Sequence, residues 1–301
     1  MKRLCMIIPF VILLCFTFSC QKAEEVAAEK EVEPTKIVDN AISADGVSIA
    51  FEVRGEGEPA LVFVHGWSNN RGVWDAQTKH FSQKYKVVTL DLAGFGESGS
   101  NRSDWTMQSF SKDVFAVVEK LRLEQVVLVG FSMGGPVVIE ASKIMPERIL
   151  GLVLVDILQN IEDKTPQKNI DELIANWREI FADEERIPEL FPAEMNQELI
   201  DKYITMAFYA PKIGWWESGE DFFRWSNEEC IESLQALQVP LISINSDYMS
   251  TDVEAFQKYI PSYQLKTIST ISHLVIWEAP DEFNRLLEEA VQEFVQMEEQ
   301  K

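Results

Sequence analysis

Histidine and cysteine are scarce in this sequence of 301 residues. It contains three histidines and four cysteines, and Cys230 is the only cysteine outside the first twenty residues. Zinc and other transition metals need several such side chains at close spacing, and these scattered residues form no ligand cluster. We therefore expect no metal site, and nothing in the sequence implies a cofactor. A single thiol in the body also excludes an internal disulfide, so the fold depends on its hydrophobic core.

Positively charged residues are also few. The chain has 49 acidic residues against 27 lysines and arginines, a formal net charge of −22, and no lysine- or arginine-rich run. An acidic surface repels phosphate backbones, which argues against nucleic acid as a partner. We interpret the acidity as a general aid to solubility.

The N-terminal apolar run is too short to span a bilayer comfortably. Lys2 and Arg3 precede residues 4–18, which are apolar apart from Thr17. This pattern is typical of a secretory signal. The following Ser19-Cys20 resembles a bacterial lipoprotein cleavage site, in which the cysteine becomes the acylated first residue. We expect a signal peptide at residues 1–19, an acidic tether at residues 20–36 and an exported cell-envelope protein anchored through Cys20; a plain cleaved signal or an uncleaved anchor is the alternative.

From residue 37 onward, short apolar runs with strand character alternate with helical stretches. The apolar runs are residues 47–53, 61–64, 87–90, 126–129, 152–155 and 241–244. The helical stretches are residues 73–83, 107–121, 135–145, 252–259 and 281–296. Continuous apolar runs are typical of parallel strands covered on both faces. The alternation predicts an α/β fold with a doubly wound, mostly parallel sheet.

One interval interrupts the alternation. Residues 157–229 have helical character and lie between two predicted strands. They are rich in aromatic side chains, namely Trp177, Phe181, Phe191, Phe208, Tyr209, Trp215, Trp216, Phe222, Phe223 and Trp225. We interpret the interval as a helical cap over the C-terminal edge of the sheet, inserted between core residues 37–156 and 230–301. Most of its aromatic residues pack within the cap, and together they form an apolar ceiling over a site.

A nucleophile motif follows the apolar run at residues 126–129. Gly130-Phe131-Ser132-Met133-Gly134 lies between this predicted strand and a predicted helix. That context is what gives the G-x-S-x-G pattern its meaning. A serine on so sharp a turn requires flanking glycines, because a Cβ atom there would collide with neighbouring backbone. The motif predicts Ser132 as a nucleophile whose hydroxyl stands clear of the sheet.

A second motif, His65-Gly66-Trp67, directly follows the predicted strand at residues 61–64. A loop in this position supplies an oxyanion donor, so we expect the backbone N–H groups of Trp67 and Met133 to form an oxyanion hole. His65 precedes the nucleophile in sequence, and we expect it to be a structural hydrogen-bonding residue.

Together with the glycine-rich segment at residues 91–98, these motifs resemble those of the α/β-hydrolase superfamily over residues 37–298. The resemblance implies that Ser98 belongs to a loop and is not a rival nucleophile. It places His273, shortly before the C-terminal helix, at the family's general-base position. His80 has no motif around it, and we expect it on the surface.

The resemblance leaves the third catalytic residue open. The family usually carries an aspartate a few residues past a glycine after its seventh strand, but this chain lacks that glycine and has Met249 at the corresponding position. Asp247 is the nearest carboxylate and our first choice. Asp156 is the alternative, because some family members carry their acid after the earlier strand. Asp252 ranks third and is better explained as a helix N-cap.

The predicted function is hydrolysis of an ester of a small apolar or aromatic substrate through an acyl-enzyme. The same triad also serves acyl transfer and cofactor-free peroxidase chemistry. A non-catalytic protein that binds an apolar ligand beneath the cap is the alternative from a different class. The absence of the acid from its usual position favours that alternative, whereas the nucleophile, base and oxyanion motifs favour an enzyme.

Overall fold

The computed structural model describes residues 35–209 and 212–301. The predicted signal peptide, the acylated Cys20 and nearly all of the tether lie outside the described residues. No helix within the described part of the chain is long and apolar enough to cross a membrane.

An eight-stranded sheet forms the centre of residues 35–301, with the strand order β1-β2-β4-β3-β5-β6-β7-β8. The strands are β1 (Lys36–Ile42), β2 (Ser48–Arg54), β3 (Ala60–Val64), β4 (Val87–Leu90), β5 (Val126–Phe131), β6 (Ile149–Val155), β7 (Leu241–Ser246) and β8 (Gln264–Ile268). β2 pairs antiparallel with both β1 and β4, and all other pairs are parallel. The predicted doubly wound, mostly parallel sheet is confirmed.

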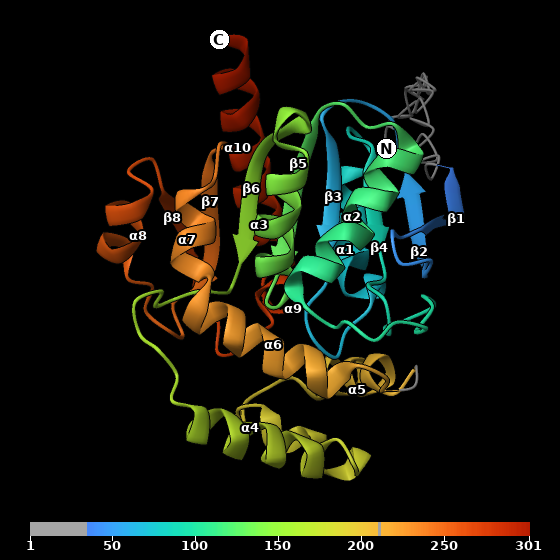
Figure 1. The fold of residues 1–301 in the computed structure, drawn as a ribbon, viewed down its shortest axis with the longest axis vertical. Helices are drawn as coiled ribbons and strands as arrows, with labels where there is room; N and C mark the ends of the chain where they lie inside the picture. The colour runs from blue at the N-terminus through green and yellow to red at the C-terminus, as the bar shows by residue number, and fades with distance from the viewer. Residues whose placement is uncertain (1–34, 210–211) are drawn as a thin grey trace, which may run out of the picture. The chain divides into compact units, whose positions relative to one another are not determined.

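Helices cover both faces of the sheet. The helices of the described residues, including those that lie beyond the strand ends, are η1 (Arg71–Trp74), α1 (Asp75–Phe81), α2 (Met107–Leu121), α3 (Gly134–Ile144), η2 (Pro146–Arg148), α4 (Gln167–Ile180), η3 (Glu184–Leu190), α5 (Gln197–Ala207), α6 (Trp215–Glu228), α7 (Cys230–Gln235), α8 (Val253–Tyr259), α9 (Val275–Glu278) and α10 (Pro280–Glu299). Figure 1 shows α2 and α3 in front of the sheet and α10 behind it. The central strands are therefore buried on both sides, which explains their continuous apolar sequences.

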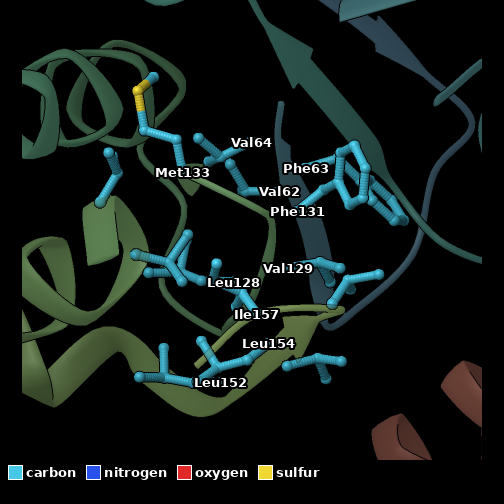
Figure 2. Close-up of a cluster of buried hydrophobic side chains, with 14 of the residues drawn as sticks. Val62, Phe63, Val64, Leu128, Val129, Phe131, Met133, Leu152, Leu154 and Ile157 are labelled. Atoms are coloured by element: carbon cyan, nitrogen blue, oxygen red, sulfur yellow. The ribbon is translucent and has the colours of Figure 1, made fainter. Parts of the chain in front are cut away.

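The core lies on the central strands. Figure 2 shows apolar side chains of β3, β5 and β6 packed together, among them Val62, Leu128 and Leu154, each fully buried. Leu61–Val64 and Val126–Val129 have no exposed surface at all. Burial of this kind stabilises the strand ends that carry the functional residues, at roughly 25 cal/mol per Å² of apolar surface.

The sequence prediction missed the two edge strands. β1 reads Lys-Ile-Val-Asp-Asn-Ala-Ile and buries only Ala41, while β8 buries only Ile268. An edge strand packs few side chains against the core, so it need not carry the apolar run from which we recognised the central strands.

The predicted cap interval, residues 157–229, contains α4, η3, α5 and α6 within its described part. In Figure 1 these helices lie together on the side of the sheet to which the arrow of β6 points. A buried carboxylate on α3 joins α6 to the core. Glu140 is 5% exposed and accepts hydrogen bonds from Trp225 Nε1 at 2.9 Å and Ser233 Oγ at 2.6 Å, and it pairs with Lys143.

Candidate active site

Ser132 occupies a strained turn between β5 and α3. Its φ of 52° lies in the left-handed region, which is rare for a residue with a side chain. The turn is held by its own backbone, because Ser132 N donates to Val155 O at 3.0 Å and Gly135 N donates to Ser132 O at 2.8 Å. Both motif glycines are required sterically. A Cβ at Gly130 would lie 2.3 Å from Gly134 O, and one at Gly134 would lie 2.5 Å from Val64 O.

His273 and Asp156 form a hydrogen-bonded pair beside this turn. His273 follows β8, and its Nδ1 donates to Asp156 Oδ2 at 2.6 Å. The imidazole ring stacks on Phe131, with ring centroids 4.9 Å apart. Asp156 Oδ1 accepts from Ser246 N at 2.7 Å, and the residue is only 2% exposed. With both carboxylate oxygens engaged, Asp156 fixes the orientation and the tautomer of His273.

Asp247, the first choice of acid, is not the carboxylate that pairs with His273 in the structure. Asp247 is exposed, and its Oδ1 accepts a hydrogen bond from Thr270 N at 3.3 Å, so it connects the loops after β7 and β8. Asp156 lies at the end of β6, the strand paired directly with the serine-bearing β5, whereas β7 is one strand further away. The alternative position after β6 is therefore the one occupied. Asp252 caps α8 by accepting from Ala255 N at 2.9 Å, as the third prediction allowed.

The loop after β3 approaches Ser132 closely. A Cβ at Gly66 would lie 2.9 Å from Ser132 Cβ, so only glycine permits this approach. The backbone N–H groups of Trp67 and Met133 donate to no acceptor within residues 35–209 and 212–301. Two free donors, one on the loop that approaches Ser132 and one on the residue after it, are suited to an oxyanion.

His65, His80 and Ser98 lie where the sequence placed them. His65 is buried; its Nδ1 donates to Gly66 O at 2.8 Å and its Nε2 accepts from Leu92 N at 3.0 Å. Burial lowers the pKa of His65, which keeps the ring neutral and able to make both bonds. His80 is exposed on α1. Ser98 Oγ donates to the backbone carbonyl of Asp91 and accepts from Ala50 N, so it braces a loop.

A cavity of about 380 Å³ joins these residues to the cap. Ser132, Asp156 and His273 line it from the sheet side. The cap side is mostly apolar, with Gln159 and Tyr203 as its polar residues, and its apolar part includes Trp177, Phe181, Leu190, Phe191, Pro192 and Phe222. Other cap aromatics serve packing instead, since Trp215 stacks on Phe95 and Trp225 binds Glu140.

Trp67 connects the oxyanion loop to the cap. Its indole Nε1 donates to Trp215 O at 2.6 Å, and its ring stacks on Trp177 with centroids 4.9 Å apart. The Trp67 side chain thus contacts both α4 and α6. The sequence analysis identified Trp67 through its backbone alone and did not predict this role for its side chain.

Two further polar residues in the cavity wall, Ser68 and Tyr203, were also missed. Their hydroxyl groups hydrogen-bond to each other. No motif marks either residue, and Tyr203 is separated from Ser68 by 135 positions in sequence. The described residues contain no group of three or more histidine, cysteine, aspartate or glutamate side chains arranged to hold a metal ion.

Comparisons with known proteins agree with this architecture. The alpha/beta hydrolase fold family profile matches residues 59–280. A Synechocystis sp. protein provisionally named a non-heme chloroperoxidase is 26% identical over an alignment of 263 positions, and the alignment covers 80% of this chain and 94% of that protein. The chain therefore belongs to the α/β-hydrolase family.

Solved structures also resemble this chain. A thermophilic esterase from Thermogutta terrifontis is 26% identical, with a TM-score of 0.73 and coverage of 86% of this chain and 99% of the esterase. A bromoperoxidase from Bacillus anthracis, 21% identical with a TM-score of 0.71, covers 87% of this chain and is itself fully covered. The latter likeness is one of fold, and the esterase and family matches support a hydrolase.

Proposed function

We propose that this protein is a serine hydrolase that cleaves esters of small apolar or aromatic acyl groups through an acyl-enzyme. One observation carries the proposal. Ser132, at its left-handed turn, lines the same cavity as the hydrogen-bonded pair His273–Asp156. In this proposal Asp156 supplies the acid that the sequence left open, and its hydrogen bond to His273 argues against a non-catalytic binding protein.

In the proposed reaction, Ser132 Oγ attacks the acyl carbon while His273 Nε2 accepts its proton. Because Nδ1 donates to Asp156, the neutral ring carries its free lone pair on Nε2, the nitrogen that must act as base. The N–H groups of Trp67 and Met133 stabilise the negative oxygen of the tetrahedral intermediate, each by roughly 3 kcal/mol. His273 then protonates the leaving alcohol, and water, activated by the same ring, releases the acid.

The cavity supports the choice of substrate. Its volume of about 380 Å³ suits a small molecule, and aromatic side chains form most of its cap side. We expect such walls to bind an apolar acyl chain or ring by burial of apolar surface.

A panel of 4-nitrophenyl esters with acyl chains of graded length, with an aromatic ester included, tests this function. The proposal expects release of nitrophenol by the wild-type protein, with a preferred chain length set by the cavity. Labelling of Ser132 by a fluorophosphonate should run in parallel. The absence of both hydrolysis and labelling in folded protein would contradict it.

Peroxidase chemistry is a second candidate, favoured by the names of the Synechocystis and Bacillus anthracis relatives. In that reaction hydrogen peroxide replaces water as the nucleophile on the acyl-enzyme, which yields a peracid and regenerates Ser132. Incubation with acetate, hydrogen peroxide and bromide, followed by bromination of monochlorodimedone, would detect it. The Ser132→Ala protein is the control.

We also propose export and acylation at Cys20, on the basis of Lys2, Arg3, the apolar run and Ser19-Cys20. Mass spectrometry of the mature N-terminus tests this. A diacylglyceryl cysteine supports the proposal, whereas a mature chain beginning at another residue refutes it.

A further inference from the structure

A pair of hydroxyl groups lies in the wall of the apolar cavity. Ser68 immediately follows Trp67, has a left-handed φ of 60° and is 1% exposed. Tyr203 projects from α5 and is 8% exposed. Their oxygens are hydrogen-bonded to each other, and both residues line the cavity that contains Ser132.

The pair has one hydroxyl proton more than its hydrogen bond uses. Each hydroxyl group carries one proton, and the bond between them uses only one of the two. Neither oxygen makes another hydrogen bond to any residue within the described ranges. Burial raises the pKa of Tyr203 to about 12, so the phenol keeps its proton at neutral pH. One O–H group therefore remains in a buried place without a protein acceptor.

Apolar side chains that cannot accept a hydrogen bond lie on the cap side of the cavity together with Tyr203. The edge of Phe191 meets the ring of Tyr203 at a centroid distance of 5.1 Å, and Leu190 and Phe181 line the same cap side of the cavity. A buried O–H group without an acceptor is destabilising, and an acceptor on a bound ligand, or water in its absence, removes that cost.

We infer that Ser68 and Tyr203 form a recognition site for an uncharged oxygen acceptor, such as an ether or ketone, on the acyl chain of the substrate. The inference rests on the proposed function and adds a chemical class to it. The acceptor is uncharged because the described residues that line the cavity include the Asp156 carboxylate and no lysine or arginine. Apolar walls alone would bind hydrocarbon chains, whereas a hydroxyl pair selects chains that carry an oxygen.

A series of esters with an ether oxygen at successive positions of the acyl chain tests the inference. The substrates are 4-nitrophenyl octanoate and the four esters in which an ether oxygen replaces the methylene at position 3, 4, 5 or 6. The enzymes are wild type, Ser68→Ala, Tyr203→Phe and the double variant. A single variant keeps one hydroxyl proton, so only the double variant removes every donor.

We expect one oxygen position to give a peak in kcat/KM relative to octanoate, and the double variant to lower that ratio by about five- to tenfold. The single variants should lower it less or move the peak. Removing both partners of a buried hydrogen bond is nearly neutral for stability, so the double variant should unfold at close to the wild-type temperature. Tyr209→Phe is the matched control, because the Tyr209 hydroxyl is exposed and donates to Glu97 outside the cavity.

A binding measurement separates this inference from the proposed function. Quenching of tryptophan fluorescence in Ser132→Ala protein reports binding of 1-octanol and of its isosteres with one ether oxygen, without any catalysis. A preference for one ether that is lost in Ser132→Ala protein lacking both hydroxyls supports the recognition site, even if no ester is hydrolysed. Equal ether preference with and without the hydroxyl pair, in hydrolysis and in binding, overturns it.

Discussion

The strand ends and the cap enclose one cavity, but they hold their side chains in different ways. On the sheet side, Ser68, Ser132 and Asp156 have φ values of 60°, 52° and 47°, and all three line the cavity. In the described part of the cap, residues 157–209 and 212–229, Leu158 at the start has a φ of 57°, and from residue 159 onward only glycine has a positive φ. Its aromatic side chains are held by ordinary helices and by contacts between rings.

This difference separates chemistry from selectivity. Left-handed backbone at a non-glycine residue costs about 1–3 kcal/mol and persists only where the surroundings fix it. The buried central strands provide such surroundings, so the atoms that react are held rigidly. The cap residues after Leu158 carry no comparable strain, and we expect changes there to alter which substrate binds more than how fast it reacts.

Ser132→Ala gives the largest expected effect in this comparison, a decrease in kcat of about 10⁶-fold. The variant removes the nucleophile and leaves the cavity and the cap intact. Ester hydrolysis and fluorophosphonate labelling measure it, and Ser98→Ala, outside the cavity, should still be labelled. Labelling of Ser132→Ala at the wild-type rate would assign the nucleophile elsewhere.

Asp156→Asn should lower kcat by about 10⁴, because an amide can stabilise the wrong tautomer of His273. Asp247→Asn is the matched control, since Asp247 is exposed and only contacts Thr270 N. It should remain within a few fold of wild type. Steady-state kinetics on one nitrophenyl ester rank the two variants, and the reverse order would restore Asp247 as the acid.

Trp67 lies where the strand ends meet the cap, and Trp67→Phe changes the contact between them. It removes the hydrogen bond to Trp215 O and keeps an aromatic ring, so we expect kcat to fall about fivefold with a smaller change in KM. Trp216→Phe is the control, because its ring lies 5.6 Å from that of Trp67 but its indole donates to no described residue. Equal effects of the two variants would show that the hydrogen bond between Trp67 and Trp215 O does not contribute to kcat.

Trp177→Ala should have the smallest effect on chemistry. It enlarges the apolar side of the cavity, so kcat/KM should shift by about tenfold in favour of longer or bulkier acyl groups relative to short ones. The nitrophenyl ester panel measures the shift. A uniform loss across the panel would mean that Trp177 supports the reacting residues rather than selecting among substrates.

Sequence reasoning located the sharp turn at Ser132 because the constraint there is local. Gly130 and Gly134 are demanded by contacts between neighbouring backbone atoms, and the flanking strand and helix are visible in the same short stretch. The same holds for the central strands, whose burial on both faces leaves an uninterrupted apolar pattern.

The acid and the hydroxyl pair could not be derived in this way. His273 and Asp156 are 117 positions apart, and which carboxylate reaches the ring depends on which strand end lies next to β5. Ser68 and Tyr203 meet only because α5 folds over the loop after β3. Edge strands such as β1 were missed because they bury little.

The carboxylate of Glu140 limits where a cap from a relative of this fold can be joined to this chain. β6 and β7 are adjacent in the sheet, so the segment between them can be exchanged without altering the strand order. Its helices α6 and α7, however, supply Trp225 and Ser233, which together with Lys143 satisfy Glu140 on the helix that follows Ser132. A chimaera joined before Trp225 keeps these donors, whereas a graft that replaces Trp225 removes one of them from a charge that is only 5% exposed.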